Sequence, residues 1–150
     1  MTAVINNALS KNLACRKLAE NSRILTADTL VWFEGKLVGK PTDKDEAYRY
    51  LNAFSGKNQT VFTGVVYSYI DIDGKLVQKV RCEASLVKFK ELNEEYIRKY
   101  IELVNPLDRA GAYDISDHGD LVVEKIIGSR SNVIGLPMEI VVEMIDKNLN

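Results

Sequence analysis

The sequence contains few residues that could build a disulfide framework or a metal cluster. Of its 150 residues, two are cysteines (Cys15 and Cys82) and one is a histidine, His118. The cysteines lie far apart and in no metal-ligand spacing, which is typical of reduced thiols in a cytoplasmic protein. A single histidine excludes a two-histidine metal site, and no G-x-S-x-G elbow accompanies it to suggest a Ser/His/Asp triad. We expect His118 to be a loop residue.

Long apolar runs and a surplus of positive charge are also missing. No run approaches the roughly 18 apolar residues of a membrane span, and the N-terminus lacks the apolar core of a signal peptide. Twenty Lys and Arg against 21 Asp and Glu leave a formal net charge of −1, which disfavours non-specific nucleic-acid binding because that binding needs excess positive charge. We expect one cytoplasmic domain over residues 1–150, without a membrane or nucleic-acid partner.

The apolar pattern predicts interspersed helices and strands. Helices are expected at 3–20, after a cap at Thr42 or Asp43, after a cap at Asn93, and from Pro137 to about residue 145. Strands are expected at 23–33, 37–38, 60–72, 75–90 and 120–127, with Asp73-Gly74 as the turn of a long hairpin. The predicted class is therefore α/β or α+β, with a mixed sheet flanked by helices.

Asp28 lies in the middle of an apolar strand, "RILTADTLVWFEGKLVGKP" (23–41). A buried carboxylate without partners is costly, so this one needs an explanation. One interpretation is structural: a strand-end carboxylate that accepts hydrogen bonds from backbone amides. The other is chemical, because the tight turn and return strand that follow can bring Asp28 and the loop around Lys40 to one edge of the sheet. Lys40 alone could equally be a solvated lysine, but an acid and a cation in one cleft suit phosphate or metal chemistry.

Two further segments favour a binding cleft. In the segment 107–113, small residues flank Gly111, which suits a tight turn or a close backbone approach. The segment 128–137 is a polar loop bounded by glycines that runs into a helix N-terminus, where backbone N–H groups and the helix dipole favour anions. Either segment could also be an ordinary loop.

Five motifs together resemble the Maf family of nucleoside triphosphate pyrophosphatases, which has the Maf/Ham1 (ITPase-like) architecture with a strongly twisted sheet. They are "LACRKLA" (13–19), "ADTLVWFEGKLVGKP" (27–41), "SGKNQTVFTGV" (55–65), "PLDRAGAYDI" (106–115) and "GSRSNVIGLP" (128–137). They occur in the family's order and spacing over nearly the whole chain. The triplet Ala27-Asp28-Thr29 resembles the branch of the family that hydrolyses dTTP and UTP.

The resemblance implies hydrolysis of a nucleotide such as dTTP or UTP between its α- and β-phosphates, giving a monophosphate and pyrophosphate. It implies that Asp28 activates water or binds a divalent cation, Mg²⁺ or Mn²⁺. Lys17 and Lys40 match the family's phosphate-facing lysines. Ser116 stands where the family has glutamine and is expected to contact the substrate. The resemblance also implies a homodimer.

The chain departs from the family's pattern at its beginning. Nothing before Lys17 matches the family's first strand or its Ser-x-Ser-Pro-Arg-Arg loop, so we expect an N-terminally short member. A histidine expected after the "SG" motif is Gln59 here. The alternative hypothesis is therefore a catalytically impaired Maf-like module that binds nucleotides or other proteins, of the septum-formation-inhibitor type.

Overall fold

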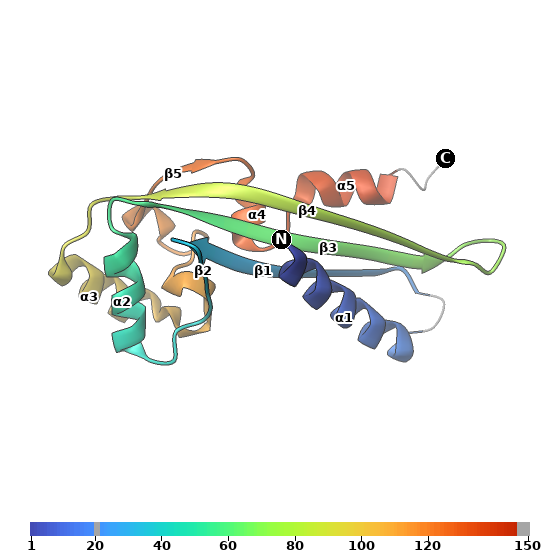
Figure 1. The fold of residues 1–150 in the computed structure, drawn as a ribbon, viewed down its shortest axis with the longest axis horizontal. Coiled ribbons are helices and arrows are strands. Elements are labelled where there is room, and N and C mark those ends of the chain that lie inside the picture. Colours follow the sequence, from blue (N-terminus) through green and yellow to red (C-terminus); the bar gives the residue numbers. More distant parts are fainter. Residues whose placement is uncertain (20–21, 147–150) are drawn as a thin grey trace.

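The computed structural model describes residues 1–19 and 22–146. A five-stranded sheet with the strand order β2-β1-β3-β4-β5 runs the length of the molecule (Figure 1). Its strands are β1 (Ile24–Phe33), β2 (Lys36–Val38), β3 (Asn58–Ile70), β4 (Leu76–Phe89) and β5 (Val123–Ile127). Each strand that the sequence predicts is present.

Within the described residues, five helices accompany the sheet, and three 3-10 turns lie between α3 and β5. The helices are α1 (Thr2–Leu18), α2 (Lys44–Phe54), α3 (Glu94–Val104), α4 (Arg130–Ile134) and α5 (Met138–Asp146). In Figure 1, α2 and α3 lie at one end of the elongated molecule, while α1 and α5 lie along its other half, below and above the sheet. Four of the helices follow the prediction, although the predicted end of the first, residue 20, lies outside the described residues.

The α/β class with a helix-flanked sheet is confirmed, and two details differ from the prediction. Every described strand pairing is antiparallel, so the expected mixed sheet is corrected to an antiparallel one. The reason is that two hairpins build most of it and the longer connections return the chain antiparallel to its neighbour. The second difference is α4, which lies inside the segment 128–137 that was predicted to be a loop. Ser129 at its N-cap and Gly135 after its last turn are the signals that could have found it.

Single residues explain where α2 and α3 begin and where the β3–β4 hairpin turns. Asp43 caps α2 by accepting from the Glu46 N–H at 2.7 Å, and Asn93 caps α3 by accepting from the Tyr96 N–H at 2.9 Å. Gly74 at the tip of the β3–β4 hairpin has φ +76°, a conformation that glycine adopts without strain. These signals act over three or four residues, which is why the sequence predicts these ends correctly.

The two faces of the sheet are covered differently. Alternate residues of a strand point to opposite faces. Odd-numbered residues of β3 face two hydrophobic clusters: Val61 belongs to the larger one with α2 and α3, and Val65 and Tyr67 belong to the smaller one with α5. The even-numbered face carries α1, which buries a narrow stripe of Val4, Ala8 and Asn12.

Candidate active site

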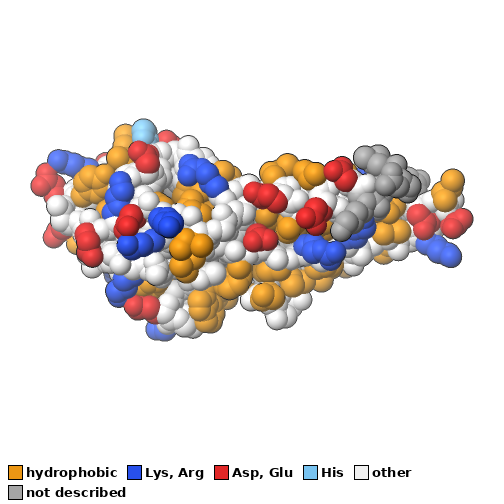
Figure 2. All heavy atoms as spheres, turned by 90° about the horizontal axis from the view of Figure 1, so that it is seen from above, with side chains coloured by type: hydrophobic (Ala, Val, Ile, Leu, Met, Phe, Trp, Pro, Cys, Tyr) orange, Lys and Arg blue, Asp and Glu red, His pale blue; other side chains and the backbone are white. Residues whose placement is uncertain are grey.

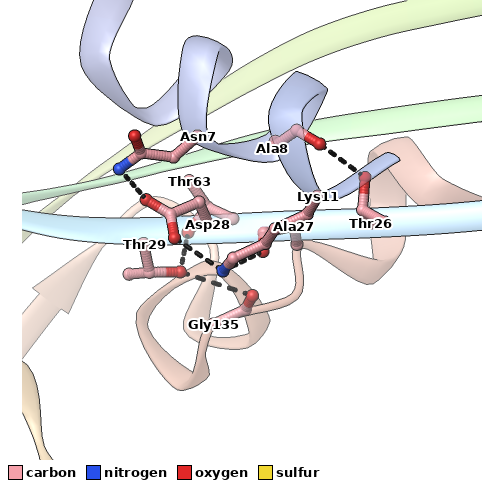
Figure 3. Close-up of polar contacts among 9 residues, drawn as sticks. All are labelled: Asn7, Ala8, Lys11, Thr26, Ala27, Asp28, Thr29, Thr63 and Gly135. Carbon is pink, nitrogen blue, oxygen red and sulfur yellow. Dashed lines mark hydrogen bonds and ion pairs between the residues drawn. The ribbon is translucent and has the colours of Figure 1, made fainter. Parts of the chain in front are cut away.

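Asp28 is held by two side chains from α1. One carboxylate oxygen accepts from the Lys11 Nζ at 2.7 Å, and the other accepts from the Asn7 Nδ2 at 2.8 Å (Figure 3). Lys11 also donates to the backbone oxygen of Ala27 at 3.1 Å. The side chain of Asp28 is only 15% exposed, so this pairing offsets much of the cost of desolvating its charge. The partners of Asp28 are therefore side chains of α1 and not the backbone amides of the structural interpretation.

Asp28 lines a cavity of about 520 Å³, within the size range of small-molecule sites. The cavity lies where β1, α1, the Lys40 loop, the segment 108–116 and the segment 133–135 meet. The Gly111 N–H donates to the Gly39 oxygen at 3.0 Å, and this bond ties the Lys40 loop to the segment that follows α3. Gly111 has φ +75°, as its predicted role in a tight turn requires. Asp28 and Lys40 thus reach one cavity, as the strand-turn-strand spacing predicts.

The cations of the cavity are held in ion pairs with carboxylates. Besides Lys11 and Asp28, Lys40 pairs with Asp108 at 2.5 Å, and Arg109 pairs with Asp114 at 2.8 Å. The hydrogen bond from Lys40 lowers the pKa of the Asp108 carboxyl below its ordinary value, and the charge of Lys40 adds to this effect. Asp108 is exposed, whereas the Asp114 side chain is only 16% exposed. Three cations around one cavity suit a polyanionic ligand, because each can exchange its carboxylate for a phosphate oxygen.

The structure brings together three of the four residues singled out from the sequence. Asp28, Lys40 and Ser116 all line the cavity. Lys17, exposed in the last turn of α1, is not among the lining residues. Lys11 lies six residues earlier on the same helix and is the lysine of α1 that pairs with Asp28. The expected contact of Lys17 with phosphate stays a prediction.

Sequence reasoning also missed Lys11, Asn7 and Arg109. Asn7 and Lys11 are four residues apart, so they share one face of α1 and can meet the same carboxylate. This spacing was the available signal, although it does not identify which strand residue the helix faces. Arg109 lies inside the segment "PLDRAGAYDI", which was singled out for its glycine and not for its charge.

A wall of the cavity is formed by Val133, Ile134 and Gly135, at the end of α4 and just after it. The Thr29 Oγ1 lies within hydrogen-bond distance of the Gly135 oxygen, at 3.4 Å, so the residue after Asp28 contacts this wall. Figure 3 shows both connections of β1, with Asp28 joined to α1 and Thr29 joined to the Gly135 loop. The cavity is therefore bounded by charged groups from α1 and the loops, and by an apolar wall from α4.

The three cations gather at the cavity, whereas the chain as a whole carries no excess of positive charge. Basic and acidic side chains lie interspersed over the face that Figure 2 shows, in keeping with a formal net charge of −1.

Among the residues that the structure describes, no helix has both the length and the apolar character that crossing a membrane requires.

The donor set of the cavity fits a divalent cation that is shared with a phosphate ligand. Within residues 1–19 and 22–146, no group of three or more His, Cys, Asp or Glu side chains is arranged to hold a metal ion by itself. Mg²⁺ typically takes only one or two carboxylates and completes its shell with water and substrate phosphates. Asp28, with both oxygens in the hydrogen-bonded network at the cavity, can supply one such carboxylate.

Comparison with known proteins identifies the family. The family model described as "Maf-like protein" matches residues 1–148. The chain therefore belongs to the Maf family, as the five sequence motifs predict.

Three curated relatives that the chain resembles carry the same name. A dTTP/UTP pyrophosphatase of Thermosipho melanesiensis is 44% identical over 130 residues, which cover 87% of this chain and 68% of the relative. The dTTP/UTP pyrophosphatase of Clostridium tetani is 38% identical, covering 85% of this chain and 65% of the relative. That of Clostridium botulinum strain Alaska E43 is 39% identical, covering 96% and 76%. The matched part thus spans about two thirds to three quarters of each relative's length.

Proposed function

We propose that this protein is a nucleoside triphosphate pyrophosphatase that hydrolyses dTTP and UTP to the monophosphate and pyrophosphate. The observation that carries the proposal is Asp28, a carboxylate held by Lys11 and Asn7 in a cavity that also contains Lys40 and Arg109. Membership of the Maf family and the name shared by the three relatives above support the reaction and the substrate class.

The chemistry of the reaction assigns the roles. Water attacks the α-phosphorus, the bond from that phosphorus to the bridging oxygen breaks, and pyrophosphate leaves. Asp28 orients the water and accepts its proton, which a carboxylate with two defined hydrogen-bond partners can do. Lys11, Lys40 and Arg109 balance the negative charge that the triphosphate brings into the cavity. Ser116, exposed at the rim, contacts the substrate.

Mg²⁺ or Mn²⁺ is the cofactor of this proposal, with Asp28 as its protein ligand. When bound, the cation supplies charge neutralisation at the phosphates. Asp28 would hold this cation, and Lys11, which pairs with Asp28 in the structure, would stay beside the phosphates as a further positive charge. Lys17 stays a predicted phosphate partner, and substitutions at Lys11 and at Lys17 distinguish the roles of the two lysines.

We further infer that the protein is cytoplasmic and that it forms a homodimer, as its resemblance to the Maf family implies. Two unpaired cysteines, Cys15 and Cys82, fit a reducing compartment. Light scattering of the purified chain tests the assembly, with a mass twice that of the 16.9 kDa chain as the expected result. A monomer mass at micromolar concentration would overturn it.

The activity is tested by measuring pyrophosphate and inorganic phosphate release from dTTP, UTP, dCTP, GTP and 7-methyl-GTP, each with Mg²⁺ or Mn²⁺ and with EDTA. We expect pyrophosphate from dTTP and UTP, and none in EDTA. Release of inorganic phosphate without pyrophosphate would show cleavage at another anhydride bond and overturn the proposal. Equal rates with 7-methyl-GTP would overturn the substrate class only.

A further inference from the structure

Asn132 in α4 is a fully buried polar side chain between the sheet and the cavity wall. Its Nδ2 donates to the Val61 oxygen at 3.1 Å and to the Ser85 Oγ at 2.9 Å, so it connects α4 with both β3 and β4. Both amide hydrogens are used, which fixes the orientation of the amide. The Oδ1 accepts from no donor within the described part of the chain. A buried acceptor without a partner lowers stability, so stability alone does not explain an asparagine at this position.

Asn132 is connected to the site through two threonines. Its backbone oxygen accepts from the Thr63 Oγ1 at 3.2 Å, and the Oγ1 atoms of Thr63 and Thr29 are 2.8 Å apart. Thr29 follows Asp28 in β1 and lines the cavity. Because Thr63 donates its hydroxyl hydrogen to Asn132, Thr29 donates to Thr63, and the Gly135 oxygen 3.4 Å away is the alternative acceptor for the Thr29 hydrogen. An unbroken chain of hydrogen bonds therefore runs from the strand that carries Asp28 to α4.

This network and the partners of Asp28 lie on opposite faces of the sheet. Asp28 is paired with Gly64 in the ladder, on the face that α1 covers, whereas Thr29 is paired with Thr63 on the face of α4. Loss of the network would consequently displace the wall at residues 133–135 more than it would displace Asp28, because Lys11 and Asn7 hold the carboxylate independently.

The wall that the network holds is the apolar side of the cavity. Val31, Val61 and Val133 line this side, whereas the charged lining comes from α1 and the loops around Lys40 and Arg109. Phosphates need the charged groups, so the valine-lined side suits the uncharged part of a nucleotide, its base and sugar.

We propose that Asn132 is a positioning residue that sets the width of the cavity between β1 and the wall at 133–135, and through it the fit of the base and sugar. The proposal rests on the function proposed above and deepens it, because it assigns substrate selection to Asn132, a buried residue outside the cavity lining.

The test uses substitutions that change the network by single groups. Thr63→Val keeps the shape and removes the hydroxyl that joins Thr29 to Asn132, while Thr63→Ser keeps the hydroxyl. Asn132→Ala removes the amide. Val141→Ala in α5 is the matched control, since Val141 is 3% exposed and lies in the smaller hydrophobic cluster, outside the cavity lining.

We expect Thr63→Val and Asn132→Ala to raise KM for dTTP about tenfold, the effect of a misfit of about one methylene group, with a smaller change in kcat. Their preference for dTTP over dGTP should fall by a similar factor. Thr63→Ser should restore the wild-type KM, and Val141→Ala should lower the melting temperature without changing KM.

Three results would overturn part of this account, and they are distinguishable. If Thr63→Val and Asn132→Ala lose stability as Val141→Ala does but keep the wild-type KM and preference, the network is purely structural and the positioning proposal fails. If the wild-type chain binds dTTP in calorimetry but releases no pyrophosphate, the proposed activity fails, and the same variants decide the positioning role by their dTTP affinities. If the wild-type chain neither binds nor hydrolyses dTTP, both proposals fail.

Discussion

At the scale of single residues, Asp28 decides the chemistry. Asp28→Asn keeps the size and the acceptor oxygen but removes the charge that orients water and accepts its proton. We expect pyrophosphate release to fall at least about 100-fold, the usual effect of removing a general base, with little change in melting temperature. Asp73→Asn, the same change at the exposed hairpin tip, is the control. A variant at Asp28 that keeps most of the wild-type rate would contradict the assignment.

Substitutions can also distinguish the roles of Lys11 and Lys17, the two lysines of α1. Lys11 contacts Asp28 and lines the cavity, whereas Lys17 does neither. We expect Lys11→Ala to weaken binding of a non-hydrolysable dTTP analogue about tenfold or more, as the loss of a hydrogen bond to a charged group does. Lys17→Ala should weaken binding less, because Lys17 is exposed and lies outside the cavity lining. Calorimetric titration gives both affinities, and the reverse order would make Lys17 the main phosphate partner of α1.

At the scale of elements, the docking of α1 on the sheet holds the site together. The helix lies directly on Gly64, where an added Cβ would meet the Val4 oxygen at 2.7 Å. Gly64→Ala should therefore push α1 away and lower the free energy of unfolding by about 1–3 kcal/mol, as overpacking does. Because Asn7 and Lys11 move with α1, pyrophosphate release should fall as well.

Gly39→Ala is the control for this change, because its added Cβ would meet nothing within 4 Å and its φ is not positive. Urea denaturation and pyrophosphate release should be measured on both variants. If Gly64→Ala unfolds at the same urea concentration as the wild type, α1 is not packed on the sheet as described.

At the scale of the whole molecule, buried tyrosines limit stability at high pH. Burial raises the pKa of Tyr100 to about 12, and burial also raises the pKa of Tyr113. A phenol in the unfolded chain ionises near pH 10. The stabilising contribution of these two groups is thus complete below about pH 10 and is lost as the pH rises from there toward the pKa of the folded state.

Melting temperatures measured between pH 8 and 12 test this expectation. We expect a plateau followed by a fall above about pH 10, and a shallower fall for Tyr100→Phe, which has one ionisable buried group fewer. Tyr96→Phe removes a hydroxyl from an exposed ring and should retain the wild-type slope. Identical slopes for all three proteins would contradict the role of Tyr100.

Much of the architecture could be predicted from the sequence, because it depends on neighbours within a few positions. Helical and alternating apolar periods predict where α1 and the long hairpin lie, Asp43 and Asn93 mark helix starts, and Asp73-Gly74 marks the turn. The motif at residues 27–41 also predicts that Asp28 and Lys40 reach one cavity, since one tight turn links the strand of Asp28 to the short strand that precedes Lys40.

Only the tertiary structure decided which side chains meet across long separations. Lys11 and not Lys17 faces Asp28 because the rotation of α1 is set by the stripe of Val4, Ala8 and Asn12 that packs on the sheet. The sequence pattern does not reveal that rotation: α1 has no strongly apolar face, and the sheet residue under Val4 is a glycine, which adds no side chain to the pattern. The network of Asn132 is likewise invisible in the sequence, since its partners in β3 and β4 lie 47 to 71 residues away and are chosen by packing rather than by local conformational preference.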